Sequence, residues 1–121
     1  MRFENLQVWQ KGMQLVKMVY LLSNDFPKTE IYSLTSQIKR SAISIPSNIA
    51  EGKGRNSIKE FINFLHISLG SLYELQTQLY LAKDLNYIYN NELYSEINIV
   101  IKELEKMINS LISNRKNNIN Y

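Results

Sequence analysis

Apolar side chains recur every three or four positions in four separate stretches of this 121-residue chain. This spacing puts them on one face of an α-helix, whereas a half-buried strand needs apolar residues at every second position. The stretches cover about residues 5–24, 31–52, 57–84 and 91–114, and turn-forming residues separate them. Because helices of this length with short connections pack as antiparallel neighbours, the sequence predicts an all-α, antiparallel up-down four-helix bundle over residues 1–115.

Local signals mark the ends of the expected helices. Pro27 ends the first helix, because proline disfavours the α conformation in the residue before it. Ser57 and Glu60 form a capping box for the third helix, in which the serine hydroxyl accepts a hydrogen bond from the Glu60 amide. Pro46 lies inside the second pattern and predicts either a kink or a helix that ends and restarts. Residues 116–121 show no periodicity, and we expect a frayed tail there.

The residue types present exclude several kinds of site. The chain has no cysteine, so it forms neither disulfides nor thiolate metal sites. Its single histidine, His66, has no second ligand at helical spacing, and a di-iron bundle needs two Glu-x-x-His motifs. His66 also lacks the preceding arginine of helical ribonucleases and any partner that would activate a nucleophile. We therefore expect no catalytic residue, no cofactor and no metal ion, and we predict that the protein is not an enzyme.

The opening residues and the hydropathy pattern bear on location. Residues 1–5 are polar and lead directly into an amphipathic pattern, without the apolar stretch of a secretory signal. No run of uncharged apolar residues is long enough to span a bilayer. We therefore expect a cytoplasmic protein with no membrane partner.

Positive charge is concentrated in the first half of the chain. Residues 1–60 contain nine basic and five acidic side chains, whereas residues 61–121 contain five and six. The basic residues that we expect around the junction of the second and third helices are Lys39, Arg40, Lys53, Arg55 and Lys59. This cluster is either ordinary surface charge or a patch that contacts phosphates of RNA or DNA, and repetition around an oligomer would strengthen such a patch.

A polar stripe runs beside the apolar face of the second helix. It is either a solvated face or a half-buried seam, in which small serines let two helices approach closely and Gln37 and Asn48 fix their register. Gly70 and Ser71 of the third helix are candidate partners, because glycine inside a helix costs about 1 kcal/mol relative to alanine and needs a packing reason. We expect them to pack near Ser44, with Glu74 near Arg40 or Lys39. The candidate residues of this assembly seam are Gln37, Ser44, Pro46, Asn48, Glu51, Gly70, Ser71 and Glu74.

These strings of residues resemble a known family. The run over residues 34–40, followed by Ser-Ile-Pro-Ser-Asn-Ile-Ala-Glu-Gly at 44–52, is similar to the "four helix bundle protein" family. Members are encoded in intervening sequences of bacterial large-subunit ribosomal RNA genes and elsewhere in bacterial genomes. Residues 67–75 resemble the second motif of the family, and residues 3–11 resemble its start. The resemblance extends over about residues 3–112.

The resemblance implies an up-down four-helix bundle and a homopentameric ring. The family also includes the accessory protein of diversity-generating retroelements, a basic pentameric barrel that works with a reverse transcriptase and binds nucleic acid. No biochemical activity is established for the family as a whole. This chain has Ser68-Leu69 where the second motif suggests Ala-Arg or Ala-Lys. The lost charge weakens the implication of nucleic-acid binding on that face, and Leu69 suits a contact between subunits instead.

Two functions follow from these observations. The leading interpretation is a non-enzymatic, oligomeric bundle that binds nucleic acid or a ribonucleoprotein through its basic surface. The alternative is a structural or protein-interaction module with no nucleic-acid role, whose partner could be a protein such as a reverse transcriptase.

Overall fold

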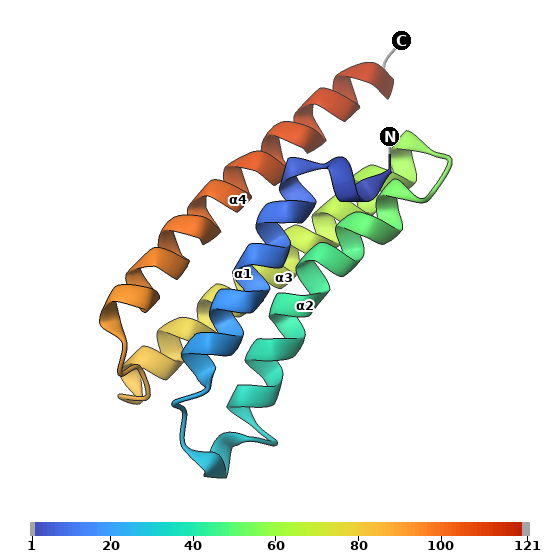
Figure 1. The fold of residues 1–121 in the computed structure, drawn as a ribbon. Helices are drawn as coiled ribbons and strands as arrows, with labels where there is room; N and C mark the ends of the chain where they lie inside the picture. The colour runs from blue at the N-terminus through green and yellow to red at the C-terminus, as the bar shows by residue number, and fades with distance from the viewer. Residues whose placement is uncertain (1, 120–121) are drawn as a thin grey trace.

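The chain folds into four long helices, and the fold is all-α as the sequence predicts. The computed structural model describes residues 2–119, with side chains through residue 117. The helices are α1 (Gln7–Ser23), α2 (Leu34–Lys53), α3 (Ile58–Asp84) and α4 (Asn91–Ile119), and two short 3-10 segments are η1 (Phe3–Asn5) and η2 (Lys28–Glu30). The helices run alternately down and up, and each packs against two others (Figure 1). No strand occurs within the described residues.

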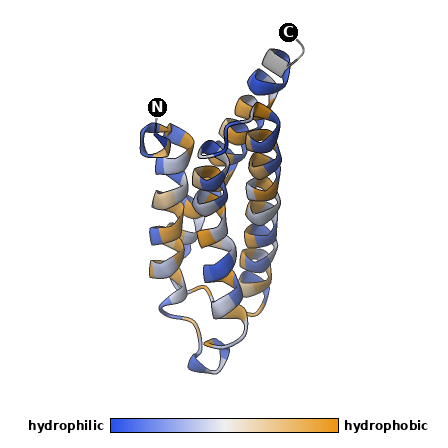
Figure 2. Ribbon diagram, turned by 90° about the vertical axis from the view of Figure 1, so that its right-hand side faces the viewer, coloured by the Kyte–Doolittle hydropathy of each residue, from blue (hydrophilic) through white to orange (hydrophobic). Residues whose placement is uncertain are grey.

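The apolar stripes of the four helices meet along the axis of the bundle. Each helix alternates between apolar and polar segments along its length, as amphipathic helices do (Figure 2). The largest side chains that are fully buried are Leu15, Ile38, Ile45, Ile49, Leu65, Leu72, Leu75, Leu79, Ile97, Ile101, Leu104 and Ile108. Their spacing of three and four residues is the spacing from which the bundle was predicted.

Side chains cap the starts of three helices. Ser57 accepts a hydrogen bond from the Glu60 amide at 3.3 Å, which is one half of the predicted capping box. The other half of the box would be a hydrogen bond from the Ser57 amide to the Glu60 carboxylate. An ion pair replaces it, in which the Glu60 carboxylate lies 4.0 Å from the guanidinium of Arg55. Asn90 Oδ1 accepts from the Leu93 amide at 3.0 Å at the start of α4. Glu30 Oε1 accepts from the Leu34 amide at 3.2 Å at the start of α2, which begins after residues 31–33 have turned away from η2.

Pro46 does not divide the second helix, so the expectation of a helix that ends and restarts is wrong. Helix α2 continues through this residue. Pro46 is buried against α1, where a Cβ atom added to Gly12 would lie only 3.3 Å from the Pro46 Cβ. Because Gly12 carries no side chain, α1 leaves room for the proline ring, and packing offsets the hydrogen bond that proline cannot donate.

Helix α4 extends to Ile119, past the predicted end at residue 114. The tail expected to be frayed is therefore helical over residues 116–119, and residues 120–121 lie outside the described part of the chain. No glycine or proline follows Arg115 to break the helix. Lys116 also places a positive charge in the last turn, where it interacts favourably with the helix dipole.

Helices α2 and α3 lie in close contact near the loop that joins them. A Cβ atom added to Gly52 of α2 would lie 2.5 Å from the Phe64 Cβ of α3. Real Cβ atoms do not come so close, so the absence of a side chain at Gly52 sets the separation of the two helices. Within the described residues, no helix is both long and apolar enough to cross a membrane.

Replacing Gly52 with alanine tests this close packing. We expect G52A to lower the free energy of unfolding by about 1–3 kcal/mol, because the added methyl group forces α2 and α3 apart. The matched control is G54A, since a Cβ at Gly54 would meet the Glu51 and Ala50 carbonyl oxygens at ordinary distances of 3.4 and 3.7 Å. We expect G54A to change stability by less than about 0.5 kcal/mol in urea denaturation. Equal effects of the two substitutions would contradict the packing described above.

Candidate nucleic-acid interface

The structure divides the predicted basic cluster into two groups. Lys39 and Arg40 lie in the first half of α2, whereas Lys53 lies at its end. Because a helix rises about 1.5 Å per residue, Lys39 and Lys53 are separated by about 21 Å along α2. Arg55 lies in the following loop and Lys59 in the first turn of α3, so only these two remain near Lys53. The five residues therefore do not form one patch.

The group around Lys53 is here called the end cluster, and it comprises Lys53, Arg55, Lys59 and Arg115. Lys53 Nζ and Arg115 Cζ each lie 5.8 Å from the centre of the Phe61 ring. Arg55 is already paired, because it donates to the Glu51 carboxylate at 3.1 Å. The sequence analysis missed Arg115, since it belongs to α4 and reaches this end of the bundle only through the fold.

The second group lines a hollow of about 690 Å³ between the end of α1, η2 and the start of α2. This hollow is here called the basic groove. Its cationic residues are Lys28, Lys39 and Arg40, and its aromatic residues include Tyr20 and Tyr32. None of the described residues that line it is acidic. The groove therefore combines positive charge with aromatic rings and contains no carboxylate to compete for the cations.

The tyrosines of the basic groove are exposed. Lys39 Nζ lies 4.7 Å from the centre of the Tyr20 ring, which is a favourable cation–π arrangement. Tyr32 is 96% exposed. Its aromatic ring therefore gains no stability from burial within the chain. The sequence analysis missed both tyrosines as site residues. Tyr20 follows the apolar spacing of α1, so periodicity alone placed it in the core, and only the fold shows that its face opens to the groove.

Two hydrogen bonds to the Glu30 carboxylate hold η2 beside the groove and turn this carboxylate away from it. Glu30 accepts hydrogen bonds from the Leu34 amide at 3.2 Å and from the Tyr87 hydroxyl at 2.9 Å. The Leu34 amide and then the Tyr87 hydroxyl lower the pKa of Glu30, and the Glu30 carboxylate raises the pKa of Tyr87. Because Tyr87 precedes α4, this contact links η2 to the connection between α3 and α4, and it keeps the negative charge of Glu30 out of the groove.

The predicted polar seam lies between α2 and α3 of the same chain. The Ser44 and Ser71 hydroxyl oxygens are 2.8 Å apart, and Ser41 donates to Glu74 Oε1 at 2.7 Å. The buried Ser68 hydroxyl donates to the Ile45 carbonyl at 2.9 Å. These small hydroxyl side chains bridge the two helices directly, which they could not do if longer side chains stood between the backbones.

The remaining seam residues have different roles. Asn48 does not cross to α3, because its amide donates to the Ser44 carbonyl and hydroxyl within α2 at 2.8 Å. Glu51 pairs with Arg55, and Pro46 faces α1. Gln37 is exposed at the surface of α2. The seam therefore depends on the serines and Glu74.

Two of three expectations about the third helix, those for Gly70 and Leu69, are wrong. Gly70 does not pack against α2, because no described atom lies within 4 Å of a Cβ added there. Glu74 lies near Arg40 as expected, because both border one hollow between α2 and α3. It accepts from Ser41 and forms no ion pair with Lys39 or Arg40 within the described residues. Leu69, expected at a subunit contact, is 9% exposed and belongs to the core.

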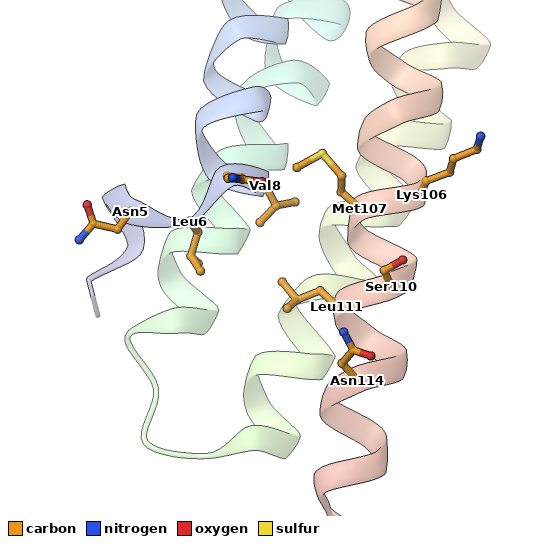
Figure 3. Close-up of a pocket in the computed structure, with 9 residues that line it drawn as sticks. Asn5, Leu6, Val8, Lys106, Met107, Ser110, Leu111 and Asn114 are labelled. Carbon is orange, nitrogen blue, oxygen red and sulfur yellow. The ribbon is translucent and has the colours of Figure 1, made fainter.

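A further hollow of about 560 Å³ lies between the start of α1 and the later part of α4. Leu6, Val8, Met107 and Leu111 border it, and Lys106 points away from it in Figure 3. This hollow is mainly apolar and offers no cation to a phosphate. Among the described residues, no group of three histidine, cysteine or acidic side chains is placed to hold a metal ion.

The fold and the site define a small four-helix bundle with a basic groove at one end of α2. The model of the family described as 23S rRNA-intervening sequence protein matches residues 4–110. The chain therefore belongs to this family, and the resemblance noted in the sequence is confirmed.

One solved structure provides a direct comparison. It is a protein of unknown function from the S23 ribosomal protein family of Bacteroides thetaiotaomicron, with 31% sequence identity to this chain. The similarity covers 88% of this chain and 95% of the other, with a TM-score of 0.76. No curated protein matches the chain.

Proposed function

We propose that the protein is a non-enzymatic, homo-oligomeric bundle that binds single-stranded nucleic acid in the basic groove. The observation that carries this proposal is the composition of the groove, which combines three cations with two exposed tyrosines and lacks any carboxylate among its described lining residues. A cytoplasmic location accompanies this function, since that is where a bacterial protein meets RNA.

The chemistry of the groove fits an unpaired strand better than a duplex. Lys28, Lys39 and Arg40 provide charges that attract phosphates without regard to sequence. Tyr20 and Tyr32 provide ring faces on which bases stack, and each stacked base contributes about 1–3 kcal/mol. Bases inside a duplex already stack on each other, so only a single strand makes use of both features.

The end cluster is a weaker candidate for the same role. Arg55 is paired with Glu51, and Glu60 lies 4.0 Å away, so two carboxylates offset its charge. Lys53 and Arg115 both lie over the Phe61 ring, which is 5% exposed and cannot stack with a base. We assign the end cluster a supporting contact with phosphates at most. RNA is the first ligand to test, because the family is named for an intervening sequence in 23S rRNA.

Binding of a fluorescent oligo(U) strand over a series of salt concentrations tests the groove. We expect Y32A to weaken binding by about 1–3 kcal/mol through lost stacking. We expect the double variant K28Q/K39Q to weaken binding at low salt, and to flatten the plot of log affinity against log salt by about 0.7 for each lost phosphate contact.

Matched controls come from other faces of the bundle. Tyr89 is 67% exposed in the connection before α4, and Lys102 is exposed on α4. Y89A therefore removes an aromatic ring, and K102Q a positive charge, outside the basic groove. We expect both controls to bind as the unaltered protein does. Binding that does not depend on salt, or equal losses in the groove and control variants, would contradict the proposal.

Self-association is supported by the outer face of α3. Gly70 is exposed, and no described atom surrounds it, so nothing within one subunit explains a glycine inside this helix. Its neighbours Ile67 and Tyr73 are 44% and 43% exposed. A second copy that packs against this face would bury both side chains and would use the close approach that glycine permits. The number of five copies comes from the family resemblance.

Light scattering after gel filtration tests this second part of the proposal. We expect the unaltered protein to elute at a multiple of the 14.2 kDa subunit mass, and G70L to shift toward the subunit mass because leucine blocks the contact. The control is S95L, which places the same side chain at an exposed position on α4. An unaltered protein that elutes as a single subunit, or a G70L variant that keeps its assembly, would contradict a contact at Gly70.

A protein-interaction role without nucleic acid is the second candidate, and one feature favours it. A hollow of about 320 Å³ on the α1–α2 face is lined largely by apolar side chains, including Trp9, Met13, Val16 and Ile43. A protein such as the reverse transcriptase suggested by the family resemblance would suit this surface. Absence of oligo(U) binding at low salt would favour this alternative.

A further inference from the structure

A polar cavity of about 370 Å³ lies beside the basic groove, between α2 and α3. All the residues that line it are polar, and they are Gln37, Arg40, Ser41, Ser44, Glu74 and Gln78. Its volume falls within the range of roughly 300–1,000 Å³ that is typical of small-molecule sites. Arg40 borders both the cavity and the basic groove. A strand that lies in the groove can therefore place one of its groups in the cavity.

One wall of the cavity presents hydrogen-bond acceptors that have no donor. Glu74 Oε1 accepts from Ser41 at 2.7 Å, which leaves Oε2 without a protein donor among the described residues. Gln78, one turn further along α3, has a buried Oε1 atom with no hydrogen-bond partner. Rotation about the last side-chain torsion, which is soft in glutamine, turns this amide toward the cavity. A ligand that fits here must bring two neighbouring donors.

The opposite wall presents a positive charge. Arg40 donates to the Ser36 hydroxyl at 3.3 Å and has no carboxylate within 4 Å in the described part of the chain. Its guanidinium is therefore available to a phosphate or another acceptor. The ligand of this cavity combines a pair of donors, directed at α3, with an anion or acceptor, directed at α2.

We propose that the cavity binds the guanine base of a nucleotide, with Glu74 and Gln78 accepting from the base and Arg40 holding the phosphate. Guanine carries two adjacent donors, N1–H and the exocyclic N2 amino group, along its pairing edge. These donors match the carboxylate of Glu74 and the amide oxygen of Gln78. Proteins read unpaired bases in RNA through hydrogen bonds to this same edge.

The other bases present the wrong pattern to a carboxylate. Adenine and cytosine each offer one amino group beside a ring nitrogen that accepts, and this acceptor would face the negative charge of Glu74. Uracil offers one N–H between two carbonyl oxygens, both of which a carboxylate repels. Because an acceptor of the base that is placed against Glu74 or Gln78 leaves both atoms unpaired, the cavity discriminates in favour of guanine.

This inference deepens the proposed function and rests on it for strand binding, although a free guanine nucleotide tests the cavity separately. The experiment is calorimetric titration of the full-length protein with GMP, IMP and AMP. We expect GMP to bind best, IMP to bind roughly tenfold more weakly because it lacks the N2 amino group, and AMP to bind on the order of 100-fold more weakly.

Substitution of Glu74 identifies the residue responsible. E74Q retains the shape of the side chain and an oxygen for Ser41, but it removes the charge and places an amide donor against guanine. We expect E74Q to weaken GMP binding by on the order of 10- to 100-fold, with an unchanged thermal midpoint. The matched control is E96Q, at an exposed carboxylate on α4, and we expect it to bind GMP as the unaltered protein does.

Each outcome has a defined meaning. The inference is overturned if the three nucleotides bind equally, if none of them binds, or if E74Q and E96Q have the same effect. Oligo(U) binding should survive in E74Q, because Glu74 does not line the basic groove. If the unaltered protein binds oligo(U) but not GMP, only the guanine site is rejected. If the unaltered protein binds GMP selectively but not oligo(U), only the proposed groove is rejected.

Discussion

The close contact between α2 and α3 is the constraint on which the rest of the structure depends. Gly52 removes the side chain that would collide with Phe64, and Ser68 fills the space between the helices with a hydroxyl bonded to the Ile45 carbonyl. Larger side chains at these positions would separate the helices and break the direct bond between Ser44 and Ser71. Most of the hydrophobic core would survive such a separation, but the polar cavity beside the seam would not.

The same contact determines which polar groups become available to a ligand. Ser41 engages one oxygen of Glu74, and Arg40 on α2 has no carboxylate within 4 Å in the described part of the chain. Glu30 is removed from the basic groove in a comparable way, because the Leu34 amide and the Tyr87 hydroxyl hold it. Positive charge therefore persists along the first half of α2 because neighbouring carboxylates are bonded elsewhere. In the end cluster the opposite holds, since Glu51 pairs with Arg55.

Helical periodicity was sufficient to predict the bundle, because each helix must bury one apolar face whatever its neighbours are. The seam was also predictable in part, since small hydroxyl residues at matching positions on two helices suggested contacts such as that between Ser44 and Ser71. The arrangement of charges was not predictable in this way. Lys39 and Lys53 are close in the sequence but far apart along a rigid helix, whereas Arg115 reaches Lys53 only through the fold.

Exposure was the other property that periodicity did not reveal. Tyr20 follows the core spacing of α1 but opens to the groove. Gly70 lies beside Ser71 as a packing site would, but no described atom lies within 4 Å of a Cβ added there. The exposure of both residues is a property of the assembled bundle. The structure thus adds to the sequence the two surfaces that the functional account requires.

The most direct measurement is photochemical crosslinking of the full-length protein to an oligonucleotide that contains 4-thiouridine, with the crosslinked peptides identified by mass spectrometry. If single-stranded RNA lies in the basic groove, crosslinks will concentrate at Tyr20 and Tyr32 and will decline as salt is raised. Crosslinks confined to the end cluster, or spread evenly over the four helices, would contradict the account.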